Sequence, residues 1–388
     1  MTKLEQLINE LCPNGAKFVA LEECCKILDN KRKPVTKAAR QAGEYPYYGA
    51  NGIQDYVSDY IFDGIFVLVG EDGSVVTPSG NPVVNWVTGK IWVNNHAHII
   101  EEKDGVLLRY LYHYLQTVNV SALIHGNIPK LTGGDFRAIK VPVPPLPVQS
   151  EIVRILDNFT ELTAELTAEL TARRQQYEYY NNTLLSFDNA KYKTLEELCD
   201  IVDYRGKTPR KVDDGIFLVT AKNIRKGFID YDKSKEYISP EDYDEVMHRG
   251  FPKIGDVLIT TEAPCGNVAQ IDNENIALAQ RVIKYRPKNN NLNSTFLKYV
   301  LLGKEFQDKL ERAATGGTVK GIKGSKLHQL TIPVPSIEEQ ERIVAILDRF
   351  DTLCNDISAG LPAEIEARQK QYEYYRDKLL TFKELIAN

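Results

Sequence analysis

Two stretches of this 388-residue chain repeat each other, and the repeat restricts its possible folds more than any other feature. Residues 142–187 recur in altered form at 333–382. A set of residues beginning with Pro142 and including Gln149 returns at a constant shift of 191, as Pro333 and Gln340. Further along, the sequence QYEYY returns at a shift of 195, so the second copy is four residues longer.

Both copies predict a long amphipathic helix. Their apolar residues follow one another at intervals of 3, 4 or 7, which places them on one stripe of a helix, and a four-residue insertion leaves that stripe continuous. At ~1.5 Å per residue, residues 149–186 span roughly 57 Å. One such helix cannot bury its stripe alone, so we expect the two to pair. The expected pairing residues are Ile152, Phe159, Leu162, Leu166 and Leu170 in the first helix, and Ile343, Phe350, Leu353, Ile357 and Leu361 in the second.

A globular segment precedes each long helix. LEECCKI at 21–27 returns as LEELCDI at 195–201, and each leads into a basic loop. We predict strands at 63–74, 90–100 and 255–267, with Glu71 opposite Glu262, and short helices at 4–11, 107–116 and 296–307. The middles of the two segments share little sequence. This combination favours two recognition heads on one scaffold with different surfaces.

The net charge of −5 argues against a nucleic-acid partner, but the distribution of charge along the chain favours one. The loops at 30–37 and 204–211 are basic in both repeats, and the glycine-rich loop at 315–326 carries three lysines spaced three apart. Glycines let a backbone approach closely, and such lysines suit a row of phosphates. We therefore predict phosphate contacts at these loops.

Several other functions lack the residues they require. The six cysteines have no zinc-site spacing and are expected to be buried thiols. His96 and His98 share a face of a predicted strand but have no third ligand nearby, so no metal site is predicted. The sequence holds no NPPY or DPPY tetrapeptide and no phosphate-binding P-loop motif, so we expect no catalytic residues. No apolar run is long enough for a membrane span or signal peptide, so we expect a cytoplasmic protein.

LTAELTAEL at 162–170 contains the tetrapeptide TAEL twice. Together with the repeat, this segment resembles the spacer of specificity subunits of type I restriction-modification systems, in the subgroup with TAEL repeats. YPYYGANGI at 45–53 and VNNHAHII at 93–100 are similar to segments common in recognition domains of that family. The resemblance covers nearly the whole chain.

The resemblance implies an α+β fold with a pseudo-twofold internal repeat. Two mixed α/β target-recognition domains, 1–146 and 188–336, would be separated by spacer helices, 147–187 and 337–388, paired as an antiparallel coiled coil. In that family the number of tetrapeptides sets the gap between the two halves of the DNA target. Each tetrapeptide adds roughly 6 Å of helix, a little under two base pairs at about 3.4 Å each.

The resemblance also implies partners and a role. The chain would recognise double-stranded DNA at a bipartite asymmetric target without being catalytic itself. It would dock two modification (methyltransferase) subunits and the restriction (endonuclease/translocase) subunits of a prokaryotic complex, away from any membrane. S-adenosylmethionine, ATP and Mg²⁺ would serve that complex, with none bound by this chain.

Basic side chains are the candidates for backbone contacts, and polar or aromatic loop residues are the candidates for base reading. The predicted DNA-binding residues are Lys31, Arg32, Lys33, Tyr47, Tyr48, Asn51, Lys130, Arg205, Lys207, Arg210, Lys211, Lys222, Asn223, Arg225, Lys320, Lys323 and Lys326. Four helix tyrosines are either partner contacts or seam packing, namely Tyr177, Tyr180, Tyr372 and Tyr375.

The second spacer departs from the family pattern. It has no TAEL, and Gly360 and Pro362 predict either a kink or the start of a new helical segment at the proline. Two alternative functions stay open: a coiled-coil scaffold whose heads bind proteins, which the acidic net charge favours, and the recognition subunit of a system whose partner fuses nuclease and methylase.

Overall fold

The computed structural model describes residues 2–73, 75–187, 190–204, 209–316, 320–355 and 359–385, which form two compact units. The first comprises Met1–Thr167 with Glu364–Asn388, and the second comprises Ala168–Ala363. Each unit therefore joins a globular head to part of both long helical segments. The division cuts the first long helix inside its TAEL repeat.

The first head is built around a six-stranded sheet. Its strand β5 (Phe62–Gly70) is the predicted buried strand, which the structure confirms. Val67 and Val69 pack into an apolar cluster that includes residues of helix α3 (Leu108–Leu115), while Phe66 and Leu68 pack into a separate cluster. Across the sheet the strands are β2 (Lys26–Ile27), β7 (Ala97–Glu101), β5, β6 (Val84–Val93), β3 (Ala42–Gly49) and β4 (Gly52–Val57), antiparallel except for the parallel pair β3 and β6.

The predicted strand over 90–100 is wrong in one respect, because a turn divides it. β6 ends at Val93 and β7 begins at Ala97. Between them the Asn94 side chain accepts a hydrogen bond from the backbone N–H of His96 (2.8 Å). An Asx turn of this kind competes with the strand ladder, which explains the break.

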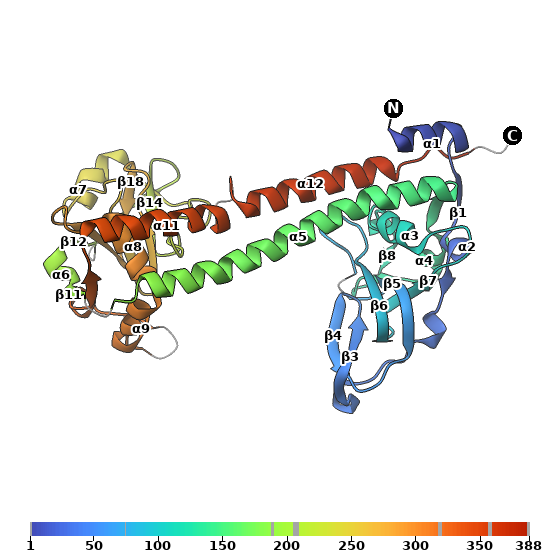
Figure 1. Cartoon of the computed structure of the whole chain (residues 1–388), viewed down its shortest axis with the longest axis horizontal. Coiled ribbons are helices and arrows are strands. Elements are labelled where there is room, and N and C mark those ends of the chain that lie inside the picture. Colours follow the sequence, from blue (N-terminus) through green and yellow to red (C-terminus); the bar gives the residue numbers. More distant parts are fainter. Residues whose placement is uncertain are drawn as a thin grey trace. The chain divides into compact units, whose positions relative to one another are not determined.

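Helices and short strand pairs complete the first unit, and α3 lies beside strands β5 and β6 (Figure 1). The predicted helices over 4–11 and 107–116 are confirmed as α1 (Lys3–Leu11) and α3 (Leu108–Leu115). α3 packs on β6, where Tyr112 lies edge-on to Trp86 with 5.8 Å between ring centroids. The remaining elements are β1 (Lys17–Ala20), α2 (Leu21–Cys24), η1 (Asp29–Lys31), η2 (Lys37–Ala39), η3 (Ser121–Leu123), β8 (Ile124–His125), β9 (Lys130–Leu131), α4 (Gly133–Ala138) and β10 (Lys140–Val143).

Most strands of the second head belong to two four-stranded sheets. In the first of these, Val257 and Ile259 of strand β16 face one apolar cluster and Leu258 faces another, as in β5. This sheet has the order β12 (Cys199–Asp203), β19 (Val282–Pro287), β16 (Val257–Thr261) and β17 (Cys265–Gln270). The other has the order β13 (Lys211–Val212), β15 (Tyr237–Ile238), β14 (Ile216–Val219) and β18 (Ile276–Leu278).

A glycine splits the helix predicted over 296–307. Gly303 has an extended backbone, with ψ at 148°, and it separates α8 (Ser294–Leu302) from α9 (Lys304–Ala313). The other elements of this head are β11 (Lys191–Thr194), α6 (Leu195–Leu198), η4 (Pro240–Asp242), α7 (Tyr243–Met247), α10 (Gly324–His328) and β20 (Thr331–Val334).

The repeat seen in the sequence is also present in the strand pairing of the two heads. β1 pairs antiparallel with β10, starting with Lys17 opposite Val143. β11 pairs with β20 in the same register, with Lys191 opposite Val334. Both heads thus attach to their long helices through equivalent strand pairs.

Each unit contains its own antiparallel helix contacts. In the first unit, Phe159 of α5 (Leu146–Leu184) stacks on Tyr375 of α12 (Leu361–Leu379) at 5.4 Å. In the second, Phe350 of α11 (Ile337–Asn355) contacts the rings of Tyr177 (6.2 Å) and Tyr180 (5.5 Å) of α5. The predicted antiparallel pairing is therefore confirmed.

The predicted seam residues differ in their burial. Ile152 and Ile343 are fully buried, but each belongs to the core of its own head. Leu361 is buried and Leu162 is 46 % exposed. Leu166, Leu170 and Leu353 are half-buried, and Ile357 lies outside the described residues.

The second long helix is interrupted where the sequence predicted it. α11 ends at Asn355 and α12 begins at Leu361, so Pro362 lies in the first turn of a new segment. Proline suits this place because the first-turn N–H groups have no partner within a helix.

Two further expectations concern the cysteines and membrane-spanning helices. Five of the six cysteines are buried and Cys265 is partly buried. Within the described ranges, none of the helices is both long and apolar enough to span a bilayer.

Candidate nucleic-acid interface

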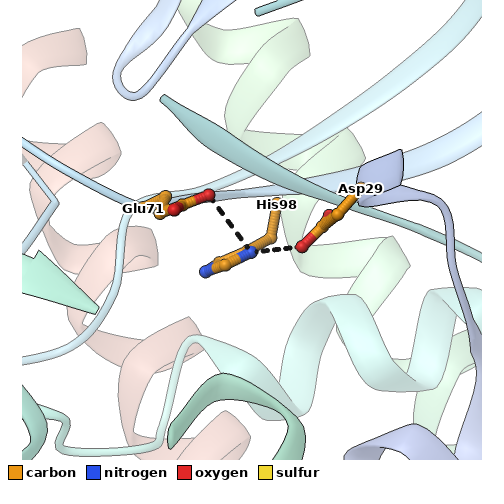
Figure 2. Close-up of side chains that lie close together, drawn as sticks. All are labelled: Asp29, Glu71 and His98. Carbon is orange, nitrogen blue, oxygen red and sulfur yellow. Dashed lines mark hydrogen bonds and ion pairs between the residues drawn. The ribbon is translucent and has the colours of Figure 1, made fainter. Parts of the chain in front are cut away.

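Three side chains from separate segments meet in the first head (Figure 2). The His98 Nδ1 atom lies 2.7 Å from Asp29 Oδ2 and 3.6 Å from Glu71 Oε2. Its Nε2 lies 3.1 Å from the carbonyl oxygen of Leu131. The imidazole is fully buried and stacks on Phe136 with 4.2 Å between centroids. Both ring nitrogens therefore have partners, and the ring joins η1, β7 and β9.

Two cations predicted to bind phosphate contact this cluster. Arg32 Nη1 lies 2.6 Å from Glu71 Oε2 and donates to the carbonyl oxygen of Ala97 (2.7 Å), and the arginine side chain is only 13 % exposed. Lys130 Nζ lies 3.3 Å from Glu71 Oε1. Burial alone would raise the pKa of Asp29, but the hydrogen bond and charge of His98, the Ile99 N–H and the Arg32 guanidinium together outweigh burial and lower it. Arg32 thus anchors the basic loop to the sheet, and its position does not support a phosphate contact.

The members of this cluster lie far apart in the sequence, so the sequence did not predict it. The ligand-type atoms of Asp29, Glu71 and His98 lie within 4.8 Å of one another, although no third group stood near the two histidines in sequence. Arg32 and Lys130 supply the positive charge that the two carboxylates require, so the residues form an ion-pair network. His96 is half exposed and contacts Asp72 instead.

The base-reading candidates of the first head are unequally placed. Tyr47 is 1 % exposed, and its hydroxyl donates to the Val35 carbonyl oxygen and accepts from the Val35 N–H. The guanidinium of Arg40 covers its ring at 4.1 Å. Tyr48 is half-buried, whereas Asn51 is exposed in the turn between β3 and β4. Tyr47 therefore belongs to the core, and Asn51 keeps the access that base reading needs.

The basic loop of the first head still presents charge to solvent. Lys31 and Lys33 are both exposed, on either side of Arg32. The backbone there is fixed by Trp92, whose Nε1 donates to the Lys33 carbonyl oxygen at 2.7 Å.

In the second head, Asn223 is a buried structural residue. Its Oδ1 accepts hydrogen bonds from the N–H and hydroxyl of Thr220, and its Nδ2 donates to the carbonyl oxygens of Asp230 and Ser234. All four hydrogen bonds an amide can make are used and the side chain has no exposed surface. Its predicted role in base reading is not supported by this placement.

The predicted cations of the second head differ in their surroundings. Lys211 pairs with Glu236 (2.7 Å) and Arg225 with Asp230 (3.3 Å). Arg210 and Lys222 are exposed, and Arg205 and Lys207 lie outside the described residues.

The lysine-bearing segment 320–326 borders a cavity that the sequence did not predict. Lys320 pairs with Glu311 at 2.5 Å, whereas Lys323 and Lys326 are exposed and form no ion pair with the part of the chain that is described. Lys323 lines a cavity of about 380 Å³ together with Glu262 and Arg281.

Comparison with known proteins identifies the family. The model of the type I restriction modification DNA specificity domain matches residues 13–173 and again 188–367. The chain belongs to this family of type I specificity subunits. A chain named as a type I restriction enzyme specificity subunit of Haemophilus influenzae is 37 % identical over 98 % of both chains. The specificity subunit of an Escherichia coli type I restriction enzyme is 38 % identical over 72 % of each.

Solved structures agree with the fold of a type I specificity subunit. The specificity subunit from M. genitalium aligns with a TM-score of 0.61 at 16 % identity, covering 98 % of this chain and 99 % of its own. A chain from a study of complex assembly in a type I restriction-modification system aligns at 0.58 and 16 % identity, over 95 % and 98 %. The double match of the family model corresponds to the two heads, and the resemblance to type I specificity subunits is confirmed.

Proposed function

We propose that this type I specificity subunit is a non-catalytic DNA-recognition chain that reads a bipartite asymmetric target. Each head would read one half-site, and the helices between them would set the gap. The chain would dock two modification subunits and the restriction subunits of a prokaryotic cytoplasmic complex. S-adenosylmethionine, ATP and Mg²⁺ would serve those partners.

The observation that carries this proposal is that equivalent scaffolds present different surfaces. The strand pairs β1–β10 and β11–β20 have the same register, so both heads join their helices in the same way. Exposed cations lie on each head, including Lys31 and Lys33 on the first and Lys323 and Lys326 on the second. Such charge provides sequence-independent contact with phosphate, while the differing loops supply selectivity.

The long helix supports a measuring role. α5 runs without interruption from Leu146 to Leu184 and includes both TAEL tetrapeptides. Removing residues 163–166 shortens a helix by roughly 6 Å and rotates the rest of the helix by about 40°, since four residues are slightly more than one turn. The change alters spacing and leaves the core of either head intact.

Methylome sequencing of a host that carries the system tests the proposal. The wild-type chain should give a methylated target of two half-sites around a fixed gap, and deletion of residues 163–166 should shorten that gap with both half-sites unchanged. Altered half-sites at an unchanged gap would refute the measuring role. If instead the purified chain with its partners has no DNA affinity at any salt concentration, the protein-scaffold alternative is favoured.

The helix tyrosines offer one refinement to the docking proposal. Tyr177, Tyr372 and Tyr375 are half-buried or buried within their units, so seam packing accounts for them. Tyr179 and Tyr374 are 65 % and 61 % exposed and occupy equivalent places in the repeat. These two exposed rings are the better candidates for contact with the two modification subunits.

A further inference from the structure

The ion-pair network of the first head has an equivalent position in the second. Val69 pairs with His98 at the end of β5, and Thr260 pairs with Val282 at the end of β16. Glu71 and Glu262 follow these two strands at the repeat shift of 191. The comparison therefore places Val282 where the first head has His98.

The surrounding loops keep this correspondence to within one residue. The Leu131 N–H donates to the Glu71 carbonyl oxygen, and the Ile322 N–H donates to the Thr261 carbonyl oxygen. Lys130, next to Leu131, neutralises Glu71, but Gly321 occupies that place beside Ile322. The second head thus lacks both the imidazole and the ammonium that fill this region of the first.

A cavity lies where those groups are missing. It measures about 380 Å³ and is lined by residues that include Thr261, Glu262, Gln280, Arg281 and Lys323. Glu262 and Arg281 form an ion pair, with 3.3 Å between Oε2 and Nε. Their side chains are 44 % and 55 % exposed, whereas Glu71 in the first head is 12 % exposed. The charged pair of the second head is therefore accessible to a ligand.

The backbone on both sides of this pair is strained. Ala263 has φ at +50° and Arg281 at +69°, and these are the non-glycine residues with positive φ within the described ranges. Such conformations are uncommon for non-glycine residues and are typical of ligand-binding positions. One lies at Arg281 itself and the other directly after Glu262.

We propose that the Glu262–Arg281 pair reads one G·C base pair of the half-site bound by the second head, an inference that rests on the proposed function. Arg281 donates from its two Nη groups to guanine O6 and N7, while its Nε faces Glu262 Oε2 at 3.3 Å. Glu262 accepts a hydrogen bond from the N4 amino group of the paired cytosine. Lys323, at the same cavity, contacts a flanking phosphate without reading sequence.

The geometry favours a joint reading by the two residues. Glutamate alone would repel the phosphates of the duplex, but the guanidinium at 3.3 Å neutralises it. The pairing also presents an acceptor beside donors, which matches the acceptors of guanine and the donor of cytosine in the major groove.

Variants in the complete complex test the inference through the host methylome. Arg281→Met and Glu262→Gln should each relax one G·C position in the second half-site, with discrimination falling about 10–100-fold there. The first half-site and the gap should stay unchanged. Arg281→Lys keeps the charge but loses the bidentate geometry, so it should relax the same position. Asp232→Asn and Lys235→Met alter another surface ion pair of this head and should leave the target unchanged.

The outcomes separate this inference from the proposed function. A wild-type bipartite target that stays unaltered in the Glu262 and Arg281 variants would overturn the inference alone. Loss of all methylation in Arg281→Met and Glu262→Gln with the wild-type target retained in Arg281→Lys would also overturn it, because the charge would then serve folding. The absence of any bipartite target in the wild type would refute the proposed function itself.

Discussion

Gln340 occupies the same place in the second head that Gln149 occupies in the first. Gln149 Oε1 accepts from the Leu107 N–H at 2.9 Å, and its Nε2 donates to the carbonyl oxygens of Gly105 and Pro144. Gln340 Oε1 accepts from the Asn293 N–H at 2.8 Å, with Nε2 donating to two carbonyl oxygens in the same way. Both side chains are fully buried. The repeated glutamine therefore fastens each long helix to the loop before the short helix of its head.

Replacing Gln149 by methionine should destabilise the first head strongly. The apolar side chain has a similar volume but leaves three backbone groups unpaired, of which the Pro144 carbonyl is buried and the other two are partly buried. Each buried unpaired group costs about 1–3 kcal/mol. Trp86 and Trp92 both lie in β6 of this head and are the two tryptophans of the chain. Tryptophan fluorescence during urea unfolding should consequently show a lower midpoint for this variant.

Two matched variants complete that experiment. Gln340→Met removes the equivalent contacts from the second head, and its effect on the tryptophan signal should be much smaller. Gln175→Met makes the same change at an exposed position of α5 and should leave the midpoint unchanged. Equal midpoints for wild type and Gln149→Met would contradict the anchoring role.

The sequence repeat singles out Gln149 and Gln340, but their anchoring hydrogen bonds were not predicted. The helices, their break before Pro362 and strand β5 follow from apolar spacing and from proline chemistry, which are local properties. The functions of Arg32 and Asn223 were not predictable in this way. Both belong to residue types that are usually exposed. Arg32 contacts Glu71 and Ala97, which lie far along the chain, whereas Asn223 forms hydrogen bonds within its own loop. The position of Arg281 at the cavity was not predicted, because no sequence pattern indicates that a non-glycine residue has a positive φ.

Arg32→Met should lower the stability of the first head. It should not impair DNA binding specifically. It leaves Glu71 and Asp29, both nearly buried, without their guanidinium partner, and breaking a buried pair costs about 3–5 kcal/mol. The urea midpoint from tryptophan fluorescence should fall. Lys33→Met changes the exposed neighbour and should keep the wild-type midpoint. A stable Arg32→Met variant with weakened DNA binding would show instead that the arginine contacts phosphate.

Replacing Lys323 and Lys326 together by alanine should weaken binding to all DNA sequences alike. Each phosphate contact contributes about −0.9 to the slope of log affinity against log salt, so the slope should become shallower by up to about 2. A salt titration on target and non-target duplexes measures both effects. Lys191 and Lys193 are exposed lysines of β11, and their double replacement is the control of equal charge. Loss of selectivity at unchanged total affinity would mean that the two lysines read bases.

His113 should make the stability of the first head fall as the pH falls below neutrality. Burial lowers the pKa of this imidazole despite the opposing hydrogen bond to Asp157, and the side chain is fully buried beside Tyr372. The folded head thus binds its proton less readily than the unfolded chain, whose histidine titrates near about 6.5. The contribution is complete above that pH and is lost as the pH falls through the lowered folded pKa.

The measurement is the urea midpoint of tryptophan fluorescence between pH 7.5 and 5.5. The wild-type midpoint should fall more steeply than that of His113→Gln, whose amide can still donate to Asp157 without titrating. His125→Gln removes a 59 % exposed histidine of the same head and should keep the wild-type slope. If His113→Gln also shows that slope, protons bind elsewhere in the head and His113 does not couple folding to pH, because a group that leaves the proton balance unchanged cannot alter the pH dependence of stability.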